Sequence, residues 1–95
     1  AGIYKYSVNK KHAANDLDVL IRIFKDTVIS IDYAGNIIVI KTLTGSANAA
    51  AEVIDSLNYI GILGSIAGDN TIFITTISQE VSEEIAAKFL KLLNQ

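Results

Sequence analysis

The sequence predicts an α+β fold: a four-stranded antiparallel sheet with helices packed on one face, preceded by an N-terminal helix. Two observations support this. Short segments rich in isoleucine and threonine occur in pairs around glycine-containing turns, which is typical of β-hairpins. Each pair is followed by a segment with apolar residues at helical spacing. The order strand, strand, helix therefore occurs twice, and 95 residues suffice for one domain.

The first helix is expected to begin at Asn15 or Asp16, since either side chain can cap a helix. Four apolar residues then follow at helical spacing and predict its buried stripe: Leu17, Leu20, Ile21 and Phe24.

The first hairpin is predicted over residues 27–33 and 37–43, with Gly35 and Asn36 in the turn. Residues 37–40 are apolar without alternation, which indicates burial on both faces of the strand. The helices can cover one face. We expect a second subunit to cover the other, and the hydrophobic content of 51% also favours a subunit interface.

The second helix is expected to begin after Ser46, a plausible cap. Its predicted apolar stripe is Ala47, Ala50, Ala51, Ile54 and Leu57. Its opposite stripe carries Asn48, Glu52 and Asp55. Taken by residue type alone, this polar stripe is a solvated face.

The central hairpin is predicted over residues 61–76, with Gly68, Asp69 and Asn70 in its turn. By residue type alone, Asp69 is a turn former. A last helix follows, capped by Ser78 or Ser82. Its predicted buried stripe is Val81, Ile85, Phe89 and Leu92.

Composition argues against several functions. There is no cysteine, and the one histidine, His12, lies far in sequence from the central hairpin, so neither an enzyme nor a metal site is expected. The net charge of −2 and the pI of about 5.1 argue against a domain that grips DNA by itself. No apolar run is long enough to span a membrane, and the cytoplasm is the expected location.

Three motifs, in order, resemble the arginine repressor family's C-terminal domain. Residues 62–72 read ILGSIAGDNTI, similar to the family signature ILGTIAGDDT. Residues 40–49 resemble its KTLPGNAN segment, and residues 30–36 resemble its first hairpin. Two residues depart from the family pattern: Asn70 replaces the second aspartate of the signature, and Thr44 replaces the usual proline.

The resemblance implies that residues 13–95 form an oligomerisation and ligand-binding domain of a transcriptional regulator of arginine metabolism. L-arginine would be the co-repressor ligand, with no other cofactor, and the chain would form homotrimers that stack into hexamers. DNA would be bound only through an N-terminal winged-helix domain, of which residues 1–12 would be the end or the linker; a short edge strand or frayed tail is the alternative. The residues implied to contact arginine are Asn48, Asp55, Ala67, Gly68, Asp69 and Asn70.

Two alternatives stay open at this point. Because Asn70 lacks the charge of the family's aspartate, the domain could serve oligomerisation alone, without a ligand. It could also sense a related amino acid such as citrulline or ornithine, and a neutral Asn70 would suit the neutral urea group of citrulline.

Overall fold

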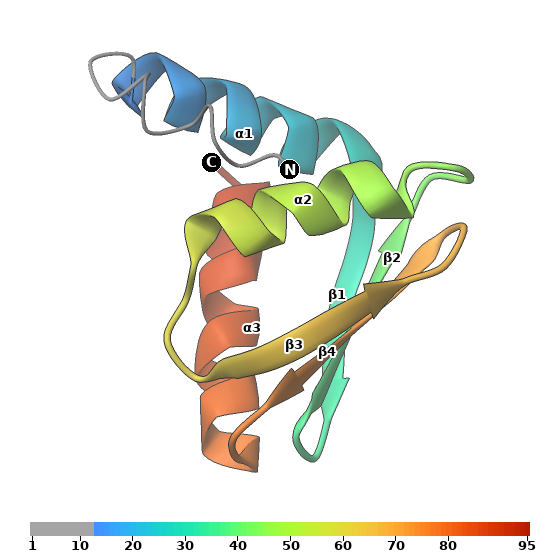
Figure 1. Ribbon diagram of the computed structural model, residues 1–95, viewed down its shortest axis with the longest axis vertical. Helices are drawn as coiled ribbons and strands as arrows, with labels where there is room; N and C mark the ends of the chain where they lie inside the picture. The colour runs from blue at the N-terminus through green and yellow to red at the C-terminus, as the bar shows by residue number, and fades with distance from the viewer. Residues whose placement is uncertain (1–12) are drawn as a thin grey trace.

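The computed structural model describes residues 13–95, and its helices and strands follow the predicted order (Figure 1). They are α1 (Ala13–Thr27), β1 (Val28–Ala34), β2 (Ile37–Thr42), α2 (Ala47–Leu57), β3 (Ile62–Ala67), β4 (Thr71–Thr76) and α3 (Gln79–Leu93). The predicted α+β class and the doubled strand-strand-helix order are confirmed. The prediction of a linker or winged-helix end at residues 1–12 lies outside the described residues.

The four strands form one antiparallel sheet in the order β1-β2-β4-β3. β4 pairs with β2, so the two hairpins lie side by side and β1 and β3 form the edges. Ile38 lies opposite Ile74, and Ile40 lies opposite Ile72. Residues directly opposite each other share a face of the sheet, and all four of these isoleucines are fully buried. They form the sheet's contribution to the core.

The three helices lie on one side of the sheet (Figure 1). α2 and α3 pack on the strands, whereas α1 packs mainly on α2 and α3. Between the helices, the ring of Phe89 lies 5.7 Å from the ring of Phe24 and 5.5 Å from that of Tyr59, measured between centroids. Burying each phenylalanine stabilises the fold by about 1.5–3 kcal/mol. The core is therefore a layer between the inner sheet face and the helices.

α1 is already formed at Ala13, the first described residue, so the prediction that Asn15 or Asp16 caps it was wrong. The alanines that precede Asn15 have high helix propensity and extend the helix past that residue. The predicted stripe is also unevenly buried, since Phe24 is fully buried whereas Leu17 is 46% exposed.

The start of α3 is fixed by a small polar cluster. The Ser78 side chain accepts a hydrogen bond from the Val81 amide at 3.2 Å, which confirms Ser78 as the cap. Thr76 Oγ1 lies 2.6 Å from Ser82 Oγ and 2.8 Å from the Ser78 carbonyl oxygen, and both hydroxyl side chains are fully buried. The Asn36 carbonyl accepts from the Thr76 amide at 2.9 Å. The first hairpin turn is thus tied to the β4–α3 junction.

The outer face of the sheet carries an apolar row. Val39, Phe73 and Ile66 lie opposite one another across β2, β4 and β3. Phe73 is 54% exposed and Ile66 is 76% exposed. No helix within residues 13–95 covers this face. The non-alternating β2 is therefore buried on its inner side and only half-buried on its outer side.

Candidate functional site

The turn between β3 and β4 is held in place by its main chain. Within the turn, the Gly68 amide donates to the Thr71 carbonyl at 2.8 Å. The Asp69 carbonyl accepts from two amides, that of Gly45 in the β2–α2 connection at 3.0 Å and that of Ala47, the first residue of α2, at 3.3 Å. The Asn70 carbonyl accepts from the Thr42 amide at 2.8 Å. The turn is therefore docked on the start of α2 without using a side chain.

This docking changes how α2 begins. Ser46 occupies the predicted N-cap position, but its side chain makes no capping hydrogen bond. The Asp69 carbonyl instead accepts from the Ala47 amide, one of the amides at the start of α2 that lack a partner within the helix. Ser46 is therefore the N-cap residue, as predicted, but its side chain makes no capping bond, and a distant main-chain oxygen accepts from the first amide of the helix.

The side chains at the turn are exposed, whereas its main chain is engaged. Asp69 and Asn70 are both exposed, and so is Asn48 in the first turn of α2. Because Asn48 follows Ala47 directly, the docked turn lies beside it. Ala67 ends β3, and Gly68 has room beside it, since an added Cβ would meet only the Thr71 carbonyl oxygen at 3.7 Å. Five of the six predicted ligand residues are therefore neighbours.

The sixth, Asp55, lies two turns further along α2. Seven residues correspond to about 10 Å of helix rise from Asn48. Asp55 is exposed, and its Oδ1 accepts from Ser65 Oγ of β3 at 3.5 Å. Ser65 was not among the residues predicted from the sequence. It lies on the inner side of β3, opposite Ile74, and a polar residue on that side of the strand was the feature that could have indicated it. Asp55 and Ser65 thus mark a second polar point where β3 passes α2.

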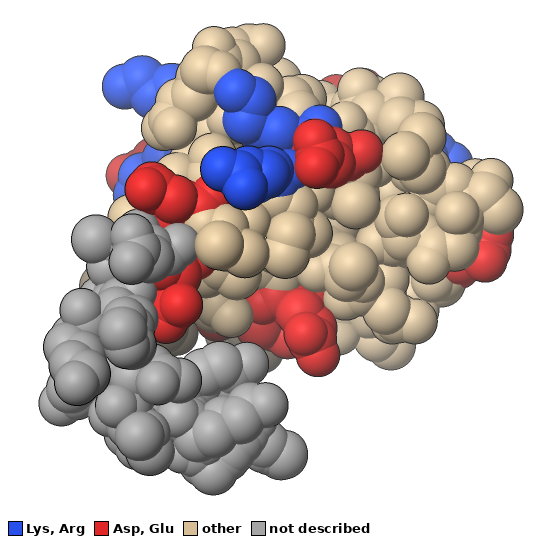
Figure 2. All heavy atoms as spheres, turned by 90° about the horizontal axis from the view of Figure 1, so that it is seen from above, with Lys and Arg blue, Asp and Glu red and all other residues tan. Residues whose placement is uncertain are grey.

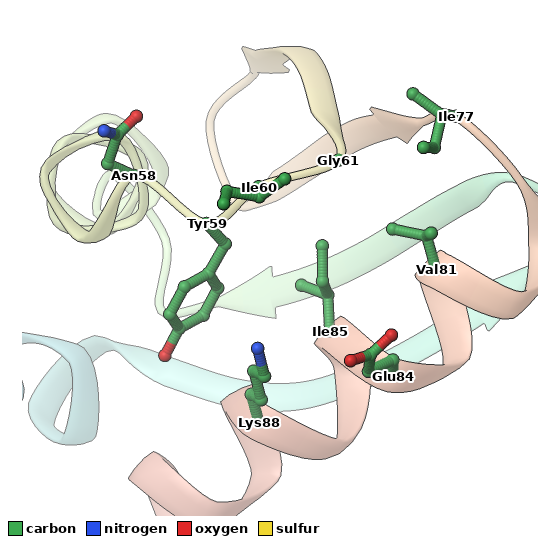
Figure 3. Close-up of a pocket in the computed structure, with 9 residues that line it drawn as sticks. All are labelled: Asn58, Tyr59, Ile60, Gly61, Ile77, Val81, Glu84, Ile85 and Lys88. Atoms are coloured by element: carbon green, nitrogen blue, oxygen red, sulfur yellow. The ribbon is translucent and has the colours of Figure 1, made fainter.

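Two hollows lie near this end of α2. A cavity of about 200 Å³ is lined by Ile54, Asp55, Asn58, Tyr59, Ile62, Leu63 and Gly64. A second, of about 520 Å³, lies between the α2–β3 connection and α3 and contains none of the predicted site residues (Figure 3). Its charged members, Glu84 and Lys88, come from α3, and the Lys88 ammonium lies 5.2 Å from the Tyr59 ring centroid. Burial raises the pKa of Tyr59.

The wall of this larger hollow requires a glycine. Gly61 has φ of +103°, and a Cβ there would lie 2.6 Å from Val81 Cγ1. A larger residue at this position would be both strained and in collision with α3. The hollow is therefore shaped by close contact between a loop and a helix, and its mixture of isoleucines with one glutamate and one lysine indicates no particular ligand.

Neither a group of metal ligands nor a membrane-spanning helix is found in the described part of the chain. Within residues 13–95, no three histidine, cysteine or carboxylate side chains are grouped so that they could hold a metal ion. No helix in the same range has the length and apolarity needed to cross a bilayer. On the face seen in Figure 2, the basic and acidic side chains of the described residues are interspersed and form no continuous basic band.

Comparison with known proteins places the chain in a family. Residues 24–91 match the family model described as "Arginine repressor, C-terminal domain". The chain therefore belongs to the family of arginine repressor C-terminal domains, as its three motifs indicated.

Individual relatives agree with the family model. The chain is 50% identical to the arginine repressor of Clostridium novyi over 92 residues, which are 97% of this chain and 61% of that protein. It is 49% identical to that of Thermoanaerobacter sp. over 90 residues, 95% of this chain and 60% of the relative. It is also 49% identical to the arginine repressor of Clostridium acetobutylicum over 94 residues, which are 99% of this chain and 63% of that protein. The chain thus spans about six-tenths of the length of these relatives.

Proposed function

We propose that residues 13–95 form the oligomerisation and L-arginine-sensing domain of a transcriptional regulator of arginine metabolism. The observation that carries the proposal is the β3–β4 turn, where main-chain hydrogen bonds hold Asp69 beside the start of α2 and leave its carboxylate exposed. Family membership supports L-arginine as the proposed ligand, because the relatives are named arginine repressors.

The chemistry of arginine suits this arrangement. Its guanidinium group presents several N–H donors, for which a carboxylate is the strongest acceptor. Asp69 would accept from the guanidinium, and the main chain at Ala67 and Gly68 would lie alongside because Gly68 has no side chain. Asn48 and Asp55 would contact the ligand from α2, and Asn70 would complete the turn. These roles are proposals for each residue.

A single exposed carboxylate would bind arginine weakly, so the proposal includes assembly. We infer that the apolar row of Val39, Phe73 and Ile66 packs against copies of the same chain and forms a homotrimer. Two trimers would stack into a hexamer with arginine between them. The carboxylates of neighbouring subunits would repel one another without ligand, and the arginine cation would relieve that repulsion. Arginine would then favour the hexamer by linkage.

The proposed parent protein would act as a repressor and not as an enzyme, in the cytoplasm. DNA would be contacted by a winged-helix domain outside the described residues. The acidic balance of the chain, with its net charge of −2, supports this division, because binding to a phosphate backbone depends on clustered basic residues. We expect the fragment alone to give no sequence-specific shift of duplex DNA, with or without arginine, in an electrophoretic assay.

The experiment that tests the proposal combines calorimetry with sedimentation. Titration with L-arginine should show binding, and sedimentation equilibrium at micromolar concentration should give a trimer or hexamer. Phe73→Glu should lower the mass towards that of a monomer. Ile60→Glu is the matched control, since Ile60 is 95% exposed but lies outside the sheet.

The measured outcomes separate the candidate functions. A wild-type protein that stays monomeric across the micromolar range would contradict the assembly. A hexamer that binds no arginine would favour the alternative of a purely structural oligomerisation domain, to which the neutral Asn70 gives specific support.

A further inference from the structure

The side chain of Asn70 is held by a chain of hydrogen bonds on the outer side of the sheet. The Lys41 ammonium lies 3.2 Å from Thr71 Oγ1, and Thr71 Oγ1 lies 3.0 Å from Asn70 Oδ1. An ammonium group can only donate, so it donates to the threonine oxygen. The threonine hydroxyl hydrogen is then free to point at Asn70 Oδ1. The chain therefore runs in one direction, from lysine to threonine to asparagine.

This direction fixes what Asn70 can offer a ligand. One lone pair of its acceptor oxygen accepts from Thr71, which holds that oxygen towards the threonine, whereas within residues 13–95 its Nδ2 group donates to no protein acceptor. A side-chain amide has two N–H donors on that nitrogen. The turn therefore presents two different groups from adjacent residues: the Asp69 carboxylate, which accepts, and the Asn70 amide, which donates.

Lys41 also makes a cationic ligand a poorer match than a neutral one at Asn70, in addition to the N–H donors of that side chain. Its ammonium is placed next to Thr71 and is exposed. A ligand that carried a positive charge to Asn70 would approach a fixed positive charge. A neutral ligand would not be repelled.

We propose that Asn70 is a specificity-determining residue, which Thr71 and Lys41 hold in an amide-outward orientation. The turn is then complementary to a neutral ureido terminus, whose N–H group faces Asp69 and whose carbonyl accepts from Asn70. A guanidinium has only donors, so it can pair with Asp69 but cannot accept from the N–H groups of Asn70. The inference rests on the proposed function and narrows its ligand class: the domain discriminates weakly between arginine and its ureido counterpart.

The test compares L-arginine with L-citrulline, which differ only in the guanidinium and ureido groups. Isothermal titration calorimetry on the wild type and Asn70→Asp gives the ratio of the two affinities for each protein. An aspartate at position 70 would accept from a guanidinium and repel a ureido carbonyl. The preference for arginine over citrulline should therefore rise by roughly tenfold or more in Asn70→Asp. Thr71→Val, which frees Asn70 Oδ1 to turn outward, should raise the same ratio to a smaller extent.

Lys41→Gln supplies an independent measurement. Removing an exposed charge near the ligand should strengthen arginine binding by about two- to fivefold at low salt. Citrulline binding should not change, because the ureido group is neutral and the glutamine keeps an N–H donor for Thr71 Oγ1. Lys91→Gln, an exposed lysine in the last turn of α3, is the matched control and should change neither affinity.

The outcomes separate this inference from the proposal on which it rests. If the wild type binds arginine but the arginine-to-citrulline ratio is the same in Asn70→Asp, Asn70 does not set specificity and the inference is overturned. If the folded wild type binds neither amino acid, the sensing function itself is overturned, and the specificity inference is overturned with it.

Discussion

The two hairpin turns of the sheet both contain an asparagine, but only one of them uses that side chain to bond to a distant strand. In the β1–β2 turn, the Asn36 carbonyl accepts from the Thr76 amide at 2.9 Å, and the Asn36 side chain takes part as well, since its Nδ2 donates to the Thr76 carbonyl at 3.3 Å. In the β3–β4 turn, the long-range bonds are made by the carbonyls of Asp69 and Asn70, and both side chains are exposed. A turn whose tertiary bonds are made by its main chain alone leaves its side chains available for a ligand. The difference indicates why only one of the turns is a candidate site.

The largest effect that would test this comparison is expected for Asp69→Ala. Losing a charge-assisted hydrogen bond should weaken arginine binding by about 1.5–3 kcal/mol, or about 10- to 150-fold. The free energy of unfolding should change by less than about 0.5 kcal/mol, because the Asp69 carbonyl and its two bonds remain. Calorimetry and urea denaturation measure the two quantities.

Asp32→Ala is the matched control, an exposed carboxylate of the other hairpin, on β1. It should leave arginine affinity unchanged. Wild-type affinity in Asp69→Ala would mean that Asp69 is only a turn former.

A smaller effect is expected when asparagine is changed to aspartate in both turns. Asn36→Asp replaces a donor by a carboxylate that faces the Thr76 carbonyl, so the free energy of unfolding should fall by about 1–3 kcal/mol. Asn70→Asp keeps an acceptor for the Thr71 hydroxyl and should change stability by less than about 0.5 kcal/mol. Denaturation curves for the two variants check this, and equal losses would show that both turns depend on their side chains.

Asn70→Asp also has an expected effect on assembly. It should bind arginine about tenfold more tightly than the wild type. Because additional carboxylates at the proposed trimer–trimer interface would repel one another, we expect the proposed hexamer to dissociate more readily without arginine in this variant. Sedimentation with and without ligand measures this, and a mutant equal to wild type in affinity and in ligand-free assembly would place residue 70 away from the site.

The smallest effects are expected for glycine to alanine in the two turns. Gly35 has φ of +58° with open space around it, so Gly35→Ala should cost about 1 kcal/mol of stability through backbone strain alone. Gly68 has no such φ, and its alanine variant should keep its stability. If the ligand approaches the main chain at Gly68, that variant should lose on the order of 1 kcal/mol of binding, about fivefold. Unchanged arginine affinity in Gly68→Ala would remove Gly68 from the site.

Local pattern sufficed to predict the helices, the strands and their order. The isoleucine and threonine content of β4 and the apolar spacing of α3 are local properties, and Ser78 caps α3 as its position suggested. The start of α1 was wrong because a capping residue was weighed above the alanines that precede it. Ser46 is the N-cap residue of α2 as its position indicated, but the sequence could not show that the oxygen that accepts from the Ala47 amide comes from Asp69, far along the chain.

The candidate site was found largely through its resemblance to a family, and the structure adds contacts that no local pattern contains. Nothing in the sequence indicates that the amides of Thr42, Gly45 and Ala47 donate to the β3–β4 turn. These three residues lie more than 20 positions before the turn, so no local pattern links them to it. The same holds for the Ser65–Asp55 contact between a strand and a helix. Five of the six residues proposed to bind arginine are neighbours through such contacts, whereas their individual roles stay predictions.

The docked turn has a consequence for hydrogen exchange. The amides of Thr42, Gly45 and Ala47 all donate to carbonyls of the β3–β4 turn, so their hydrogens can exchange with solvent only when the two segments separate. A ligand held by the Asp69 side chain would make that separation rarer. The slowing would then be recorded on the β2–α2 connection, although the carboxylate that holds the ligand belongs to the other hairpin. Three amides would therefore report on occupancy of a site to which their own residues contribute no side chain.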